Sequence, residues 1–336
     1  MLKSLTQLQK HSRRVLITKR VLPVFAFLLA ALMVTWPLFQ EQKNSFSLGI
    51  SSDTAGKGAK MDMENIRFFG LNTKKLPITL TTPTVKEIDP KTHQLRMENP
   101  VATYQITSNE TLTGKTSYAL IFQETETLFF EEKINITSPS GYHAVTSRVT
   151  CDYNNGTVDS AESISIKGPA GNVDAKGLWI SDKGNIILFK KNVLATIHQK
   201  NEKIKLSSPE GARIDQVQST LTTLGRTTVY HQGNVLTADQ IVAYYTHDRN
   251  NRIERVVATG HVLIENGKQK MTGEKGTYYP ASRKIFMEGN VRLSQGEHHI
   301  NGDQATLDLT TGESDLKAVG RIKGQILPTQ LKKDTK

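Results

Sequence analysis

A glycine-phased repeat restricts the fold of this chain more than any other feature of its sequence. A glycine followed two positions later by Val or Ile marks the repeat, with successive glycines 27, 29 and 31 residues apart: Gly233, Gly260, Gly289 and Gly320. We expect each of these repeat-corner glycines to permit a corner of positive φ or a close approach of strands. A single unit cannot bury its own apolar face, so the repeat predicts units stacked into an elongated all-β body.

Short runs of alternating apolar residues predict strands throughout the chain from residue 61 onward. Val145, Val149 and Cys151 share one parity, and Asn155-Gly156 is a dipeptide typical of tight hairpin turns. The one competing helical segment, 239–245, is short, and we expect a strand there. The sequence therefore predicts an all-β protein.

The distribution of charge argues against a nucleic-acid partner. The net charge is +11, from 43 Lys and Arg and 32 Asp and Glu. Residues 1–20 hold six basic and no acidic side chains, so the rest of the chain carries only +5. The excess positive charge thus belongs to an N-terminal segment and not to a basic domain.

An uncharged segment, 21–39, follows these basic residues. As a helix it would rise about 28 Å, close to the hydrocarbon thickness of a bilayer. The alternative is a cleaved signal peptide, but its apolar region would be shorter, and no small-residue cleavage pattern follows. We expect a single-pass anchor, with residues 1–20 cytoplasmic, the body across the membrane and 40–60 a polar linker. In a bacterium with two membranes the anchor would lie in the inner membrane and the body in the periplasm.

No group of residues in the sequence indicates catalysis or a metal site. Cys151 is the only cysteine, which excludes an intramolecular disulfide and a multi-cysteine metal site. His298 and His299 have no cysteine or spaced carboxylate pair nearby, and turn chemistry explains Glu274 and Asp303, which lie beside glycines. We predict a protein that is not an enzyme and that uses no cofactor and no metal.

Two parts of the chain resemble components of lipopolysaccharide export. Residues 61–200 resemble LptC, the membrane-anchored periplasmic component, in Phe68-Phe69-Gly70, in Met97-Glu98-Asn99-Pro100 and in the segments 141–147, 168–177 and 187–193. Residues of about 229–326 are similar to the OstA/LptA repeat domain, as in the segments 233–239, 288–293 and 302–305. The order of anchor, linker and two stretches of repeat is more specific than any single motif.

The resemblance implies an open β-jellyroll, in which the two walls of a folded sheet enclose an apolar groove for lipid acyl chains. LptC normally ends near residue 200 of this sequence and LptA is normally a separate chain, so this chain joins the two. The joint, 200–224, matches neither half clearly. The expected divisions are a basic segment 1–20, an anchor 21–39, a linker 40–60, an LptC-like jellyroll 61–205, an OstA/LptA-like jellyroll 206–328 and a polar tail 329–336.

The function implied by the resemblance is a periplasmic conduit that carries lipopolysaccharide from an inner-membrane ABC transporter towards the outer membrane. Because every second side chain of a strand points to the same face, the candidates for the groove are Ile134, Ile136, Val145, Val149, Ile186, Leu188, Val291, Leu293, Ile300, Leu307 and Leu309. For each of them the alternative is a closed, filled core. Four cations are candidates for contacts with lipid phosphates, or simply keep the sheet soluble: Lys190, Lys191, Arg292 and Lys323.

Open sheet edges are the expected docking sites for partners. We expect Phe68-Phe69-Gly70 to face the transporter, and the edge near 319–326 to face further LptA-like or outer-membrane translocon modules. Two other functions stay open at this point. One is a membrane-anchored structural or adhesion scaffold of β-repeats without lipid transfer, and the other is a β-helix carbohydrate enzyme, which would need carboxylates clustered on one face.

Overall fold

A computed structural model describes residues 62–71, 75–89, 91–92, 94–107, 110–181, 184–199, 202–246, 252–267, 269–311, 313–317 and 323–325. The transmembrane anchor predicted at 21–39 lies outside these ranges, as do the linker and the polar tail. Within them, no helix has the length and hydropathy needed to cross a bilayer.

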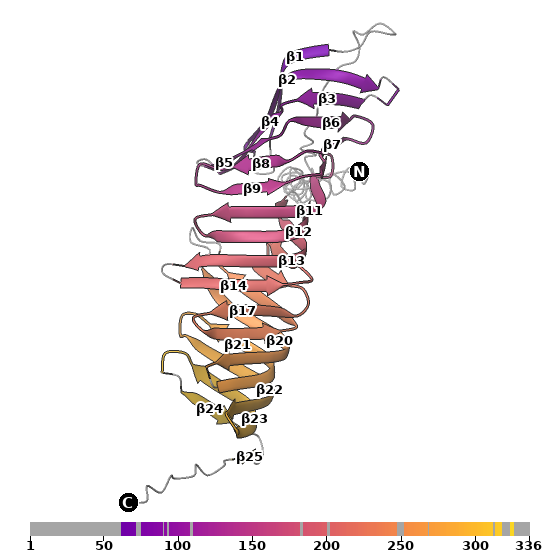
Figure 1. Cartoon of the computed structure of the whole chain (residues 1–336). Coiled ribbons are helices and arrows are strands. Elements are labelled where there is room, and N and C mark those ends of the chain that lie inside the picture. The colour runs from indigo at the N-terminus through magenta and orange to yellow at the C-terminus, as the bar shows by residue number, and fades with distance from the viewer. Residues whose placement is uncertain are drawn as a thin grey trace, which may run out of the picture. The chain divides into compact units, whose positions relative to one another are not determined.

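The described residues form one antiparallel sheet whose strands stack one after another (Figure 1). The N-terminal strands are β1 (Asp62–Leu71), β2 (Pro77–Asp89), β3 (Gln94–Glu98), β4 (Val101–Thr107), β5 (Glu110–Lys115), β6 (Tyr118–Phe122), β7 (Thr127–Phe130), β8 (Ile134–Thr137), β9 (His143–Thr146), β10 (Val149–Asp152), β11 (Thr157–Gly168), β12 (Gly171–Ser181) and β13 (Ile186–Gln199). The C-terminal strands are β14 (Glu202–Ser208), β15 (Ala212–Asp215), β16 (Thr220–Thr223), β17 (Thr227–His231), β18 (Asn234–Ala238), β19 (Gln240–Tyr245), β20 (Ile253–Asn266), β21 (Gln269–Tyr279), β22 (Lys284–Gln295), β23 (His298–Asp308), β24 (Ser314–Lys317) and β25 (Lys323–Gln325).

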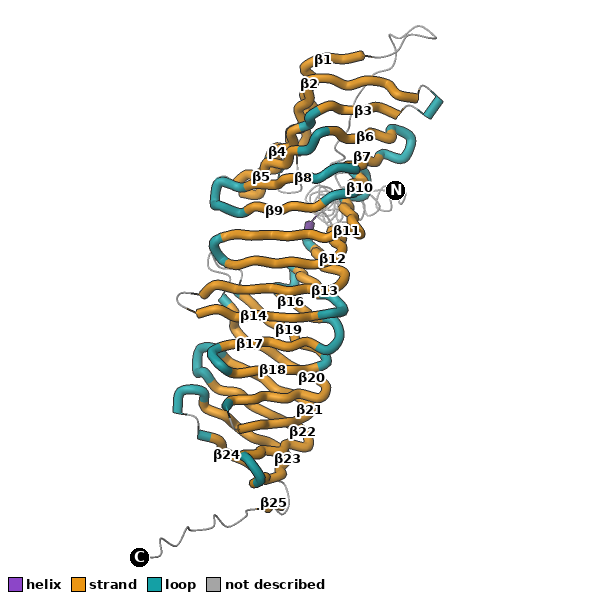
Figure 2. The backbone as a smooth tube through the Cα atoms, viewed as in Figure 1, coloured by secondary structure: helices purple, strands orange, loops and turns teal. Residues whose placement is uncertain are grey.

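The sheet is folded into two walls, because each long strand pairs with different neighbours along its two halves. In β13, Ile186–Phe189 pairs with β15 whereas Val193–Gln199 pairs with β14. We call the wall that contains β4, β5, β8, β9, β14, β17, β18 and β25 the A wall. The B wall contains β3, β6, β7, β10, β15, β16, β19 and β24, and the long strands run through both (Figure 2).

Bulges mark the corners where the long strands pass from one wall to the other. In β20, Thr259 pairs with Lys275 and Val262 with Gly273, so Gly260 and His261 face the single residue Glu274. An extra residue of this kind bends a strand sharply. Gly260 has a φ of 74° and His261 one of 42°, and the same pair of left-handed conformations recurs in Gly289 and Asn290 of β22.

Three apolar clusters fill the space between the walls. They lie in the N-terminal strands around Met97 and Ile121, in the middle around Ile164 and Phe189, and in the C-terminal strands around Met287 and Val291. The side chains of Met287 and Val291 are 0 % exposed. The all-β jellyroll prediction is therefore confirmed, as is the expected strand at 239–245, where the chain forms β19.

Candidate functional site

A row of inward-facing residues runs along the A wall from β1 to β25 without interruption. Each member is the cross-strand partner of the next, and such partners have Cβ atoms about 4.5–5.5 Å apart on one face. Every side chain in the row is apolar, apart from two glycines. We call it the A row: Phe68, Leu80, Ala102, Gly114, Ile136, Ala144, Ile166, Val173, Ala195, Leu206, Val229, Leu236, Ile264, Met271, Leu293, Ile300 and Gly324.

The B wall carries a matching row, built in the same way from β3 to β24. Its members are aliphatic or aromatic, with Cys151 among them, until the last position, which is a serine. We call it the B row: Leu95, Ile121, Leu128, Cys151, Val158, Ile180, Ile187, Ile214, Leu221, Ala243, Val256, Tyr278, Ile285, Leu307 and Ser314.

The two rows face each other across the interior. Ile264 and Met271 of the A row lie in the same buried cluster as Leu307 of the B row, and Leu206 packs on the same cluster as Ile214. Near the C-terminal end, Leu293 and Leu307 line one small pocket from opposite walls. The two rows therefore give the interior a continuous apolar lining, and each CH₂ group moved onto it from water gains about 0.8 kcal/mol.

The rows also pass through the joint at 200–224, which sequence comparison assigned to neither half. On the A wall the path is Ala195, Leu206 and Val229, and on the B wall it runs from Ile214 to Leu221. Backbone hydrogen bonds thus connect the LptC-like and LptA-like regions directly. The boundary predicted at residue 205 falls within β14, in the middle of this ladder.

Buried hydroxyl groups replace apolar side chains at the corner of the joint. Ser208, Thr223 and Thr227 are each 0 % exposed. The Ser208 hydroxyl lies 2.6 Å from the Gly211 carbonyl oxygen, the Thr227 hydroxyl lies 3.1 Å from Ser208 Oγ, and Thr223 Oγ1 accepts a 2.9 Å hydrogen bond from the Ile241 amide. Because every one of these hydroxyls has a partner, the corner can be buried without an unsatisfied polar group.

Most of the predicted groove residues face the interior. None of the eleven is classed as exposed, and Val291 and Leu307 belong to the C-terminal cluster, against which Leu293 and Leu309 pack. The other inward-facing members of the predicted set are Ile134, Ile136, Val149 and Ile300. Whether lipid contacts any of them stays a prediction.

Three predicted groove residues lie on the outer face, so we leave them out of the proposed groove. Val145 pairs with Ser165, and both face outward because their neighbours Ala144 and Ile166 face inward. Val145 and Val149 face opposite ways because the alternation shifts by one residue at the corner after Thr146. Ile186 and Leu188 alternate with Ile187 and Phe189, which point inward. The run Ile186–Phe189 is apolar at all four positions, so alternation alone could not separate its two faces. Inward Ile187 and Phe189 were missed for the same reason.

Two of the predicted repeat-corner glycines, Gly260 and Gly289, lie beside acidic side chains, whereas Gly233 lies in the turn between β17 and β18 and has no atom within 4 Å of an added Cβ. Gly233, Gly260 and Gly289 have φ values of 80°, 74° and 78°, whereas Gly320 is outside the described residues. A Cβ atom added to Gly289 would lie 2.6 Å from Glu274 Oε2, and one added to Gly260 would lie 2.5 Å from Asp239 Oδ2.

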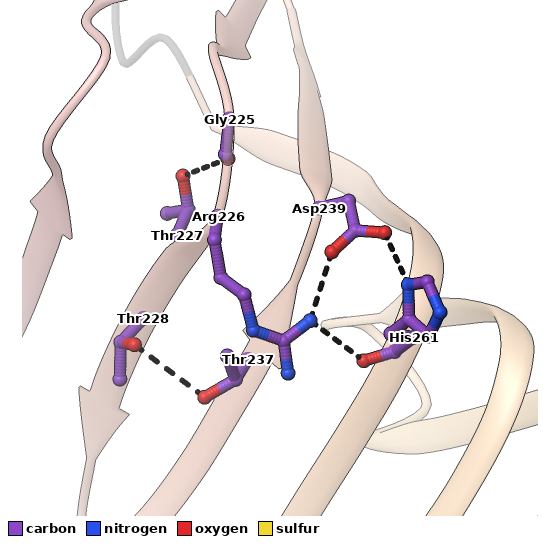
Figure 3. Close-up of polar contacts among 7 residues, drawn as sticks. All are labelled: Gly225, Arg226, Thr227, Thr228, Thr237, Asp239 and His261. Atoms are coloured by element: carbon purple, nitrogen blue, oxygen red, sulfur yellow. Dashed lines mark hydrogen bonds and ion pairs between the residues drawn. The ribbon is translucent and has the colours of Figure 1, made fainter.

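Asp239 shows how such an acid holds a corner together (Figure 3). Its Oδ2 lies 2.6 Å from His261 Nδ1, and its Oδ1 accepts a 2.8 Å hydrogen bond from Arg226. These two hydrogen bonds hold the pKa of the Asp239 carboxyl below its ordinary value, and the one with His261 has the larger effect. At the equivalent place in the next repeat, Glu274 accepts a hydrogen bond from Asn290. These acids thus have a structural role in the corner.

The described residues contain no group of three or more His, Cys, Asp and Glu side chains arranged to hold a metal ion. Of the four candidate cations, Lys190 forms an ion pair with Asp159, whereas the side chains of Lys191 and Arg292 are exposed. The fourth, Lys323, lies on β25, and its side chain is outside the described part. What the described residues offer is therefore an interior lined by two apolar rows, without a metal-binding group.

Comparison with known proteins gives two adjoining family matches. Residues 27–199 match the model described as lipopolysaccharide-assembly, LptC-related, and residues 210–313 match the model described as LptA/(LptD N-terminal domain) LPS transport protein. No curated protein matches the chain.

A solved structure also matches part of the chain. It is LptH, the LptA-homologous periplasmic component of the conserved lipopolysaccharide transport device from Pseudomonas aeruginosa. The two are 18 % identical, the match covers 37 % of this chain and 95 % of that one, and the TM-score is 0.33. The LptC-related model spans half of the sequence, and with it the resemblance seen in the sequence is confirmed. The chain belongs to the LptC-related family of lipopolysaccharide-assembly proteins and continues into a region that matches LptA.

Proposed function

We propose that this protein is a periplasmic conduit for lipopolysaccharide, whose acyl chains travel between the A row and the B row. The observation that carries the proposal is the uninterrupted course of both rows through the joint, because a break there would expose the acyl chains to water. A lipid with several chains gains about 0.8 kcal/mol for each CH₂ group that stays out of water. The charged head can remain outside the walls.

The proposal extends to the direction of transfer. Residues 1–20 and 21–39 would anchor the chain in the inner membrane, and β1 would receive lipid from an ABC transporter there. Among the described strands, β1 pairs with β2 alone, so its other edge offers free backbone groups for pairing. Phe69 on this edge strand is 62 % exposed. The opposite end, after β24, would meet an LptA-like or outer-membrane partner.

Adjacent positions 292 and 293 test the conduit. Leu293 points inward and packs on the C-terminal cluster, whereas Arg292 is exposed on the outer face of β22. A photo-crosslinking amino acid at 293 is expected to capture glycolipid in cells, and one at 292 is not. Capture at both positions, or at neither, would refute the conduit for this strand.

A pair of charge substitutions at the same positions supports the crosslinking. Leu293→Asp puts a carboxylate into an apolar space, at a cost of several kcal/mol, and is expected to reduce copurified glycolipid. Arg292→Asp is the matched control and should leave it nearly unchanged. A thermal melt of each variant separates lost binding from lost folding. A scaffold with a filled core would show unfolding of Leu293→Asp and no glycolipid in the unsubstituted protein.

A further inference from the structure

A second inward row lies beside the A row, one step closer to the hairpin turns of the A wall. Residues two apart on a strand share a face, so the members that flank Leu236, Ile264, Met271 and Leu293 face the same way as these residues. From β17 to β23 each member pairs with the next, and every member is an Asn, Gln or His residue, whose side chain can form hydrogen bonds. We call it the amide row: His231, Asn234, Asn266, Gln269, Gln295 and His298.

The character of this second row changes at the start of the LptA-like region. Immediately before His231 its members are Ile204 and Ile197, which are apolar. The A row beside it stays apolar through the same strands. The LptA-like region therefore offers hydrogen bonds along one side of its apolar interior, and the neighbouring strands of the LptC-like region do not.

Two buried side-chain oxygens in the LptA-like region lack a hydrogen-bond partner among the described residues. Asn234 Oδ1 and Ser314 Oγ are buried, and neither has a partner within the described structure. Ser314 ends the B row and lines the same small pocket as Asn266, Gln269 and Leu293. A buried polar atom without a partner costs about 1–3 kcal/mol. The pocket thus combines an apolar wall with polar groups that a ligand can satisfy.

We propose that the amide row binds the uncharged polar linkage of an acylated sugar, while the A row holds its acyl chains. This inference rests on the proposed function. Amide side chains both donate and accept hydrogen bonds, which suits ester and amide carbonyls and sugar hydroxyls. A phosphate would call for Arg or Lys instead. The amide row contains neither, and Lys270, which also lines the pocket, forms a 2.7 Å ion pair with Glu265. In such a lipid the linkage joins the acyl chains to the sugar. A lipid whose acyl chains contact the A row would therefore place its linkage beside them, where the amide row lies.

The test replaces three members of the row by apolar residues of similar size, in the variant Asn234→Leu/Asn266→Leu/Gln269→Met. Two probes are titrated against the full chain in detergent: a phosphate-free glucosamine with ester- and amide-linked acyl chains, and a free fatty acid of the same chain length. Affinity for the acylated glucosamine is expected to fall about tenfold or more, with affinity for the fatty acid unchanged. The matched control is Thr237→Val/Thr272→Val/Ser294→Ala, on the outer face of β18, β21 and β22.

The outcomes separate this inference from the conduit itself. Unchanged affinity for both probes, or an equal fall for both, overturns the role of the amide row while leaving the conduit in place. An unsubstituted protein that binds neither probe overturns the conduit, and this inference with it. If the triple variant does not fold, Gln295→Met, at an exposed member of the row, replaces it. That single change is expected to lower only the affinity for the acylated glucosamine, by about threefold.

Discussion

Substitution of Gly289 by alanine should destabilise the C-terminal strands more than the same substitution at Gly296, another glycine with a positive φ. Gly289 has a φ of 78°, and a Cβ atom there would lie 2.6 Å from Glu274 Oε2 and 2.8 Å from Glu274 Cβ. The carboxylate of Glu274 can rotate away from the added methyl group, but the Cβ atom of Glu274 cannot, because it is fixed to the backbone of β21. Gly296, in the turn between β22 and β23, has a φ of 61° and no atom within 4 Å of the added Cβ.

The magnitudes follow from these two environments. A left-handed conformation costs an alanine about 1–2 kcal/mol, and both variants bear this cost. At Gly289 the overlap with Glu274 adds about 1–3 kcal/mol, as is typical of an overpacked site. We therefore expect a loss of about 2–5 kcal/mol for Gly289→Ala and about 1–2 kcal/mol for Gly296→Ala.

Hydrogen exchange followed by mass spectrometry on the full chain in detergent measures this difference locally. Amides of β21 and β22 should exchange at least about thirtyfold faster in Gly289→Ala, since about 1.4 kcal/mol corresponds to a factor of ten. In Gly296→Ala the acceleration should be clearly smaller. Equal acceleration in the two variants would show that the contact with Glu274 contributes nothing, and would refute the packing argument for the corner.

Two further predictions concern the interior and the sheet edge. Burial raises the pKa of the Cys151 thiol to about 12, so at pH 8 its alkylation by iodoacetamide should be about a thousandfold slower than that of an exposed thiol; a rate within tenfold of free cysteine would contradict its inward position. Deletion of 313–336 should weaken capture of the outer-membrane-side partner in a pull-down and leave capture of the transporter intact, whereas equal loss of both would argue against polarised docking.

The sequence was sufficient for the fold class because glycine spacing and side-chain alternation are local signals. The sequence also distinguished inward Leu293 from outward Arg292, since the positions on either side of Leu293, Arg292 and Ser294, are polar. Alternation did not separate Ile187 from Leu188, because both faces of that run are apolar. Nor could it place Val145, since a corner of the sheet lies between Val145 and Val149 and shifts the parity.

The amide row had no signal in the sequence that could be recognised in advance. Successive members are 3 to 32 residues apart, and all six flank hairpin turns, where polar residues are expected in any case. Only the cross-strand register brings Asn234 beside Asn266, and Gln269 beside Gln295. The same holds for the joint, whose continuity depends on pairings such as that of β14 with β17.

A joint made of paired strands determines stoichiometry. Separate proteins that meet edge to edge can assemble in variable numbers, and a flexible linker would allow a third subunit to enter between two modules. On the A wall, both edges of β14 are paired, one with β13 and the other with β17. On the B wall, β15 is paired with β13 and β16, and β16 is paired with β15 and β19. One LptC-like part accompanies one LptA-like part because both belong to one chain, and the pairings leave no free strand edge at the joint where a further subunit could pair.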